Sequence, residues 1–219
     1  MKLNKEEKAM QNGELGAPRR WAIEHMIQVG RFFDAPDLVP VTQAHIMADT
    51  ESLGEAGVEF IEGLAAYPQH ERQVRIPMIT DPRGIDFCHY RRLGQTEQMA
   101  SLERRTIDAF EAMGILMTNT CINYQTIMPP LRGEHLAFGD TGVVIYCNSV
   151  LGACSNFEGG PSALAAGLTG RHRAMDYIST TIAGQHGDTG WNSNHNTWLT
   201  GVLSVVLSER VWGLIGKYR

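Results

Sequence analysis

The spacing of apolar residues along the chain predicts three amphipathic helices, over residues 18–33, 52–64 and 96–113. In each stretch, large apolar side chains return every three or four positions, which places them on one face of a helix. Asn4 is followed three residues later by Glu7, a pattern typical of a helix start in which each side chain caps the other's backbone amide. A shorter helix is therefore expected near the N-terminus.

Short apolar runs predict buried strands over residues 38–41, 74–79, 115–118 and 143–146. The turn-forming sequence Asp81-Pro82-Arg83-Gly84 ends the second of these runs. Helices that alternate with short buried strands indicate an α/β layered fold.

The second half of the chain divides at a change in composition. Gly159-Gly160-Pro161-Ser162 opens a helix of small residues over 163–168, and Gly170 ends it. Beyond about residue 172 the helical periodicity is lost, and the apolar run 199–207 fits either a strand or a short helix. We therefore expect one domain over residues 1–175 and a divergent tail over 176–219.

Composition narrows the class of protein. The chain has 219 residues, of which 43% are hydrophobic and 20% charged, as in ordinary soluble globular proteins. The formal net charge is -5 and the Lys and Arg residues are scattered, which argues against sequence-independent binding of nucleic acid. The N-terminus has no apolar signal core and no run is long enough to span a membrane, so the expected location is the cytoplasm.

The four cysteines are candidates for reduced thiols or metal ligands, because a chain without a signal sequence rarely holds a disulfide framework. Cys121 directly follows a predicted buried strand, which would fix the direction of its thiol and suits a metal ligand or a nucleophile. A buried cysteine also serves simply as a small apolar side chain. No pair of cysteines has the Cys-x-x-Cys spacing that would favour a metal site.

Asn148 and Ser149 lie in the most unusual stretch of the sequence, a loop rich in amides, hydroxyls and glycines that runs into the predicted helix at 163–168. Backbone amides at a glycine-rich turn before a helix bind carboxylate or phosphate groups, and these two side chains would add hydrogen bonds. A tight loop whose Asn and Ser side chains bond only to their own backbone is the alternative.

Two further residues are candidates for chemistry on a small acid. His45 has the titration range of a general acid or base. Arg83 offers a planar guanidinium that grips a carboxylate through two parallel hydrogen bonds. The alternatives are a structural histidine and a plain turn.

Several segments together resemble one family. In order along the chain they are Gly13-Glu-Leu-Gly16, Gln43-Ala-His-Ile46, Asp81-Pro-Arg-Gly-Ile-Asp86, Thr120-Cys-Ile-Asn-Tyr124, Gly133-Glu-His135, Asn148-Ser-Val-Leu-Gly-Ala153, Gly159-Gly-Pro-Ser-Ala163 and Thr169-Gly-Arg171. In this order and spacing they are similar to the large subunit, or large domain, of aconitase X. The resemblance covers roughly residues 1–175.

The resemblance implies an aconitase-like layered α/β/α domain, here truncated, with an iron or iron–sulfur centre where a large and a small part meet. It implies a hydro-lyase that removes water from a small hydroxy acid, cis-3-hydroxy-L-proline or mevalonate 5-phosphate, and favours the former. It assigns Cys121 to the metal, Asn148 and Ser149 to the substrate, and places His45 near the site as the catalytic candidate. Arg83 is the further candidate for substrate binding, on the chemistry of its guanidinium alone. The expected protein partner is the family's small subunit, and no nucleic acid or membrane is expected.

Two departures from the family pattern weaken this assignment. Cys154 stands where the family has an arginine, and a thiol cannot replace the two-pronged grip of a guanidinium. The family also continues beyond the matched part with further cysteines, so the metal ligand set of this chain is incomplete. The alternatives are a non-catalytic α/β domain that binds a small anion at residues 159–162, and an interaction subunit that associates through residues 199–207.

Overall fold

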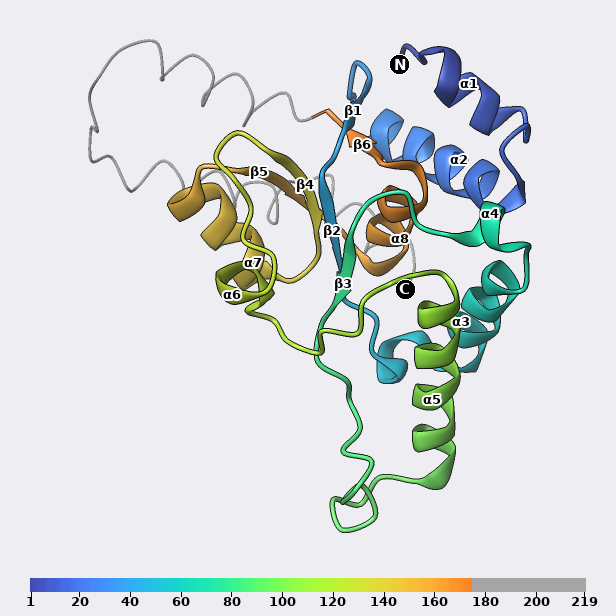
Figure 1. Ribbon diagram of the computed structural model, residues 1–219, viewed down its shortest axis with the longest axis vertical. Helices are drawn as coiled ribbons and strands as arrows, with labels where there is room; N and C mark the ends of the chain where they lie inside the picture. Colours follow the sequence, from blue (N-terminus) through green and yellow to red (C-terminus); the bar gives the residue numbers. More distant parts are fainter. Residues whose placement is uncertain (175–219) are drawn as a thin grey trace, which may run out of the picture. The chain divides into compact units, whose positions relative to one another are not determined.

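A four-stranded parallel sheet organises the protein, seen in a computed structural model that describes residues 1–174 (Figure 1). The strand order is β3-β2-β4-β5, so the first of these strands in sequence lies inside the sheet. The strands are β2 (Gln43–Ile46), β3 (Met78–Thr80), β4 (His135–Phe138) and β5 (Cys154–Phe157). A separate antiparallel pair joins β1 (Leu38–Pro40) to β6 (Arg171–Arg173), next to the start of the chain.

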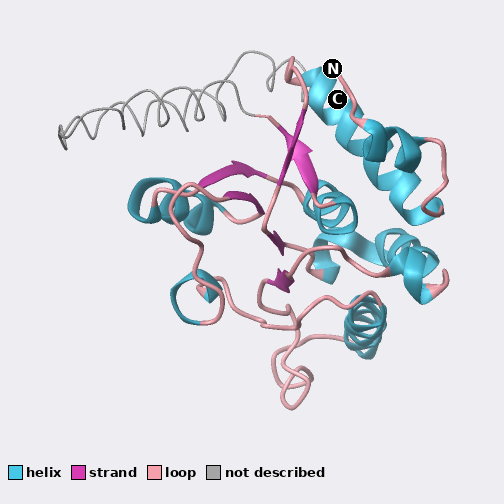
Figure 2. Cartoon of the chain, turned by 45° about the horizontal axis from the view of Figure 1, so that its top comes forward, coloured by secondary structure: helices cyan, strands magenta, loops and turns pink. Residues whose placement is uncertain are grey.

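Helices cover both faces of the sheet (Figure 1 and Figure 2). The helices are α1 (Lys5–Gln11), α2 (Ala17–Phe32), α3 (Thr50–Ala65), α4 (Gln69–Arg72), α5 (Glu97–Ala112), α6 (Asn123–Thr126), α7 (Thr141–Tyr146) with the π-helical turn η1 (Cys147–Leu151), and α8 (Gly160–Thr169). Helix α8 lies against β2 and β4 with α2 behind it, whereas α6 and α7 lie on the opposite side. This is the three-layer α/β/α arrangement that suits an all-parallel sheet buried on both faces.

The alternation of side chains along the strands explains the two cores. In β2, Ala44 and Ile46 point into the larger core, which they share with α2 and α8. In β4, Leu136 and Phe138 belong to the smaller core beneath α6 and α7. His45 lies between Ala44 and Ile46 and therefore faces the smaller core, where its ring meets that of Phe138. The sheet thus directs a histidine toward its α7 side.

The expected helices are confirmed together with the signals that begin and end them. The N-terminal capping box forms, since Glu7 donates its backbone amide to Asn4 and accepts the Asn4 amide in return. Thr96 caps α5 with its hydroxyl, which accepts the backbone amide of Met99. Gly170 ends α8 in the left-handed conformation that glycine adopts most easily, with φ 68°.

The strand expectations are confirmed in part, since β1 and β3 overlap the predicted runs 38–41 and 74–79. Residues 143–146 form helix α7 rather than a strand, because a four-residue apolar run buries equally well as a helical turn. Of residues 115–118, Leu116 makes a single parallel bridge to β3. The strands β2, β4 and β5 had no recognisable pattern, since both faces of each are buried. Residues 199–207 and the rest of the tail lie outside the described residues, and no helix among those described is long and apolar enough to cross a membrane.

Candidate active site

Three potential metal ligands gather at the carboxyl ends of the parallel strands. Asp81 follows β3, Asp140 follows β4, and Cys121 follows the segment that bridges to β3. One ligand atom from each lies within 4.8 Å of the other two. Parallel strands end at the same edge of a sheet, so residues distant in sequence meet there, as is usual for binding sites in open α/β sheets.

The backbone around this group is shaped for close approach. Asp140 and Asn119 both have a positive φ, 51° and 52°, which is uncommon for residues other than glycine and is found at functional sites. Gly139 donates its amide to the carbonyl of His45 at 2.9 Å. A Cβ atom at residue 139 would lie 3.2 Å from that carbonyl and from the carbonyl of Glu158. Glycine therefore allows the backbone before Asp140 to pass close to both.

The segment that carries Cys121 is fastened to β3 by two threonines. Thr118 donates its hydroxyl to the carbonyl of Thr80 at 2.8 Å and accepts the Thr80 amide at 3.2 Å. Beyond the single bridge at Leu116, these side-chain bonds take the place of a continuous ladder of backbone hydrogen bonds between the segment and β3. Cys121 is thus held beside Asp81 by side-chain contacts as well as by the sheet.

His45 lies behind Asp81. Its Nε2 is 3.3 Å from Asp81 Oδ1, and its ring packs edge-on to Phe138 with the centroids 5.9 Å apart. The His45 side chain has no exposed surface, whereas that of Asp81 is 9% exposed. Neither ring nitrogen makes a well-aligned hydrogen bond within residues 1–174. His45 therefore meets the site through Asp81.

The thiol of Cys121 has its pKa raised to about 11, first by burial and then by a hydrogen bond to Asp81 and the charges of Asp81 and Asp140. At neutral pH the thiol is therefore protonated while no cation is bound. A cation between the two carboxylates would reverse this preference, because a coordinating thiol loses its proton.

Arg83 lies in a buried ion pair close to Asp81. Its side chain is 6% exposed, and one guanidinium nitrogen is 3.1 Å from Glu103, which is fully buried. Thr50 donates its hydroxyl to the other oxygen of Glu103 at 2.7 Å. The Nε and the second terminal nitrogen of Arg83 are buried without a hydrogen-bond partner in the described part of the chain. Two of its donors thus remain unused.

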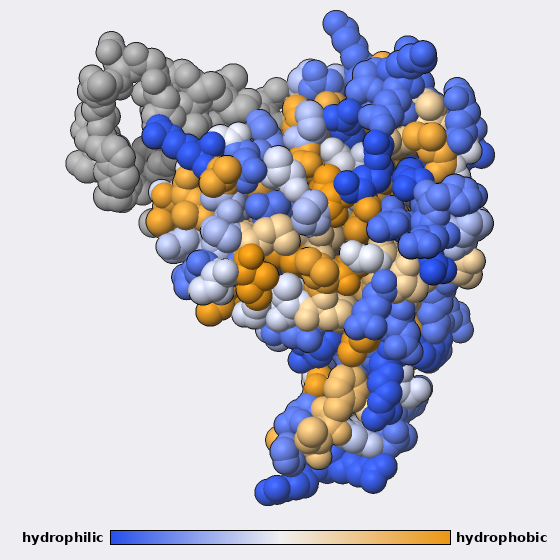
Figure 3. Space-filling model, in the orientation of Figure 1, coloured by the Kyte–Doolittle hydropathy of each residue, from blue (hydrophilic) through white to orange (hydrophobic). Residues whose placement is uncertain are grey.

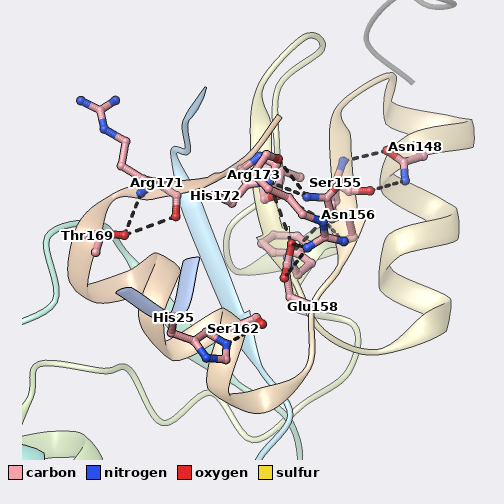
Figure 4. Close-up of polar contacts among 12 residues, drawn as sticks. His25, Asn148, Ser155, Asn156, Glu158, Ser162, Thr169, Arg171, His172 and Arg173 are labelled. Atoms are coloured by element: carbon pink, nitrogen blue, oxygen red, sulfur yellow. Dashed lines mark hydrogen bonds and ion pairs between the residues drawn. The ribbon is translucent and has the colours of Figure 1, made fainter. Parts of the chain in front are cut away.

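Asn148 and Ser149 make backbone contacts instead of joining this group. The Asn148 amide donates to the Ser155 carbonyl at 2.9 Å and accepts the Ser155 amide at 2.8 Å, which ties η1 to β5 (Figure 4). Ser149 donates its hydroxyl to the carbonyl of Ile145 at 2.5 Å. The substrate roles expected for these two residues stay predictions.

A second polar cluster, of Asn156, Glu158, His172 and Arg173, is buried where β5 approaches β6 (Figure 4). Arg173 contacts both oxygens of Glu158, at 2.9 and 3.0 Å. The Asn156 amide nitrogen reaches the carbonyl of Arg173 at 3.2 Å and Nδ1 of His172 at 2.7 Å. Because that nitrogen is a donor in both contacts, His172 Nδ1 is an acceptor and the imidazole is neutral.

Burial shifts the pKa values of His172 and Glu158 in this second cluster. Burial lowers the pKa of His172 to about 3, with smaller contributions from the nearby charges of Arg173 and His135. Burial also raises the pKa of Glu158, against the opposing effect of Arg173. The cluster therefore holds one ion pair and one neutral imidazole in the protein interior.

The donors at the sheet edge fit a single metal ion with mixed ligands. One thiol and two carboxylates offer a soft sulfur and hard oxygens, a set open to iron. Asp81 Oδ1 is buried without an aligned hydrogen bond, which leaves this oxygen able to coordinate a cation. A cluster held by thiolates alone needs more cysteines than Cys121, the one thiol in this group among residues 1–174.

The sequence offers Cys121 and His45 as candidates but no role for Asp81 or Asp140. Asp81 was visible within the Asp-Pro-Arg-Gly turn that ends a predicted strand. Asp140 was hidden because β4 was not recognised and the next apolar run was interpreted as a strand. Correct placement of β4 would have put Asp140 just beyond a strand end, the position from which residues reach such a site.

Comparison with known proteins places this chain in a family. A family profile described as "Aconitase X first domain" matches residues 1–178. The chain is 34% identical over 176 residues to the phosphomevalonate dehydratase large subunit of Methanothermobacter thermautotrophicus, with 80% of this chain and 43% of that protein covered. With the same subunit of Methanocaldococcus jannaschii it is 32% identical over 219 residues, which cover 99% of this chain and 52% of the relative.

A solved structure and a second type of dehydratase are also similar. The crystal structure of Thermococcus kodakaraensis aconitase X in its holo-form superposes with a TM-score of 0.70 at 29% identity, covering 79% of this chain and 42% of the other. A cis-3-hydroxy-L-proline dehydratase of Hypocrea jecorina is 28% identical over 153 residues, which cover 70% of this chain and 25% of that protein. The chain thus spans about half, or less, of the length of the curated relatives it matches. With the family profile covering residues 1–178 and the parallel sheet matching a solved member, this chain belongs to the aconitase X family.

Proposed function

We propose that this chain is the large-subunit part of a hydro-lyase that eliminates water from a small hydroxy acid. The observation that carries the proposal is the meeting of Asp81, Cys121 and Asp140 at the carboxyl edge of the sheet, in a family whose relatives are named as dehydratases. Elimination of water needs a group that takes a proton beside a carboxylate, assistance to the departing hydroxyl, and donors for the carboxylate.

Asp81, Cys121 and Asp140 are the residues that would hold iron. Bound iron would supply the Lewis acid that polarises the departing hydroxyl. His45 is the catalytic candidate of the sequence, and its enclosure limits it to one role. Its Nε2 holds Asp81 from behind and takes or returns a proton there. The Phe138 ring packs edge-on against the imidazole and holds it in the core.

Arg83 is the first candidate to bind the substrate carboxylate, because two of its buried donors are unused. Glu103 holds the guanidinium by an ion pair at 3.1 Å, and the charge of Asp81 also acts on it. Asn148 and Ser149 are the further candidates for substrate contact. Asn148 has one amide hydrogen beyond the one that bonds to Ser155, and Ser149 is exposed on η1.

The substrate class has two candidates, each supported by a different observation. Mevalonate 5-phosphate is supported by relatives that are 34% and 32% identical and are named phosphomevalonate dehydratase. Cis-3-hydroxy-L-proline is supported by a relative at 28% identity and by the motifs around Asp81 and Asn123. Both are hydroxy acids with a carboxylate, so the same site serves either. The protein partner we propose is a small subunit, since the archaeal relatives are named large subunits.

Metal content tests the site independently of turnover. The chain, purified without oxygen, should retain iron with absorption in the visible region, and Cys121→Ala or Asp140→Asn should lose it. Cys88→Ala is the matched control, because that thiol is exposed and lies outside the ligand group. Retention of iron by Cys121→Ala would remove this thiol from the metal site.

Turnover tests the reaction. The chain supplied with a small subunit should dehydrate one of the two acids, and His45→Ala should lower kcat per bound iron. If neither acid is dehydrated by an iron-loaded complex, the reaction assignment is wrong. Absence of both iron and turnover would instead favour the second candidate, a non-catalytic domain that binds small anions.

A further inference from the structure

The loop between β3 and α5 forms a hollow that lies away from the sheet and from the potential metal ligands. Residues 84–95 project beyond the body of the protein at the N-terminal end of α5 (Figure 1 and Figure 3). The hollow has a volume of about 310 Å³ and is lined mainly by the 87–92 segment and Arg104. This volume is at the lower end of the range for small-molecule sites. None of its lining residues belongs to the sheet-edge group.

Positive charge exceeds negative charge around this hollow. Arg91, Arg92 and Arg104 line it, and the first and third share a single carboxylate, Glu97, at 2.9 and 3.3 Å. Arg92 has no carboxylate partner in the described part of the protein. His89, also in the lining, is paired with Asp86 just outside it at 2.9 Å. Three guanidiniums line the hollow and only two of them share a carboxylate, which is an excess of positive charge in a chain whose net charge is -5.

Aromatic rings hold two of the guanidiniums in place. Arg104 lies over the ring of Phe87 at 5.2 Å, and Arg91 lies over the ring of Tyr90 at 5.3 Å. The Tyr90 hydroxyl donates to Glu97, which ties the loop to the first turn of α5. Stacked guanidiniums lose less freedom when they bind an anion, so the arrangement favours binding over a set of free surface arginines.

The base of the loop is closed as well. Gln95 donates its side-chain amide to the carbonyl of Gly84 at 2.6 Å, which joins the two ends of the loop. Ile85 and the Tyr90 ring pack with Ala100 of α5 in a small apolar cluster of their own. The two ends of the loop are thus joined, and its apolar side is packed against α5.

We propose that this hollow binds a phosphate-class oxyanion, either the phosphate group of an ester or free phosphate. A phosphate carries nearly two negative charges and three acceptor oxygens, which match guanidinium donors better than a singly charged carboxylate does. Glu97 occupies one side of Arg91 and Arg104 and leaves the remaining donors, with all of those on Arg92, to the ligand. The site is additional to the proposed function and does not depend on it.

Calorimetric titration of the full chain with inorganic phosphate and with phenyl phosphate, at low ionic strength, tests the proposal. Arg92→Ala should weaken binding about fivefold, as expected for a partly exposed charged hydrogen bond. Its fold should be unaffected because the side chain has no described partner. Arg20→Ala is the matched control, since Arg20 is an exposed arginine on α2 paired with Glu24. Glu97→Gln should tighten binding, because it removes the internal competitor of the ligand.

The two ligands separate the sources of the anion. Tighter binding of phenyl phosphate indicates an ester whose organic part lies on the exposed Phe87 ring, and equal binding indicates free phosphate. The proposal is overturned if no binding is detected up to about 10 mM phosphate. It is equally overturned if Arg92→Ala binds as the wild type does, or if Arg20→Ala loses as much affinity as Arg92→Ala.

Discussion

Replacement of His172 by Gln should make the protein markedly less sensitive to mild acid. His172 is 1% exposed and its imidazole accepts a hydrogen bond from Asn156, so the folded protein keeps it neutral. Its pKa is about 3 when folded, against 6.5 for an ordinary histidine. Because the folded pKa is the lower one, the stabilisation is complete above about pH 6.5 and is lost as the pH falls toward 3.

The size of the effect follows from proton linkage. Between about pH 7 and pH 5 the unfolded chain takes up a proton at residue 172 and the folded chain does not, which costs about 2 kcal/mol of unfolding free energy. Glu158 acts in the opposite direction, since its raised pKa lets the folded protein take up a proton first as the pH falls. The effect of His172 is therefore isolated by comparing how the unfolding free energy changes with pH in the wild type and in His172→Gln, rather than by the wild type alone.

Denaturant unfolding at both pH values, monitored by circular dichroism, gives the two free energies. Glutamine retains an acceptor for Asn156 but does not titrate, so His172→Gln should lose about 2 kcal/mol less than the wild type over this interval. His70→Gln is the control, because the His70 side chain is 80% exposed and should leave the slope unchanged. An equal slope in His172→Gln and wild type would refute the assignment of a buried neutral imidazole.

Three further changes test other parts of the structure. Glu158→Ala should lower the unfolding free energy by about 3–5 kcal/mol in denaturant titration, because it leaves Arg173 buried without its counter-charge; a loss below about 1 kcal/mol would mean that this pair is solvated. Asn148→Ala should cost about 1–3 kcal/mol by the same measurement, since two buried backbone groups lose their partners, whereas unchanged stability with weaker substrate binding would favour the substrate role. Mass spectrometry after alkylation at neutral pH should find Cys88 modified and Cys121 largely unmodified in the metal-free protein, with the Cys121 rate rising toward pH 11; rapid modification of Cys121 at neutral pH would contradict its raised pKa.

The helices could be predicted from the sequence because their signals are local. Helix α5 shows both its apolar period and its capping residue, Thr96, within its own length. Of the strands, β1 and β3 overlap the predicted runs 38–41 and 74–79, whereas β2, β4 and β5 could not be predicted, because they are four residues long and almost fully buried. Strand β2 contains a glutamine and a histidine, both buried, so neither alternation nor a continuous apolar run marks it.

The candidate site was predictable only where one residue carried its own signal. Cys121 and His45 were identified as single reactive side chains in a family motif. That Asp81 and Asp140 join them depends on the strand order, which places β2 between β3 and β4. Strand order is set by packing across the whole domain, so a sequence pattern a few residues long does not contain it.

This strand order also has a consequence for how the protein is made. β2 is the first strand of the sheet to be synthesised. One of its edges pairs with β4, which is synthesised much later, so this edge stays unpaired until β4 is available. Contacts between segments so distant in sequence slow folding, because a long loop must close before the pairing stabilises it. A nascent chain on the ribosome therefore exposes the unpaired edge of β2 until Phe138 has emerged, and over this interval it is open to chaperone binding or aggregation.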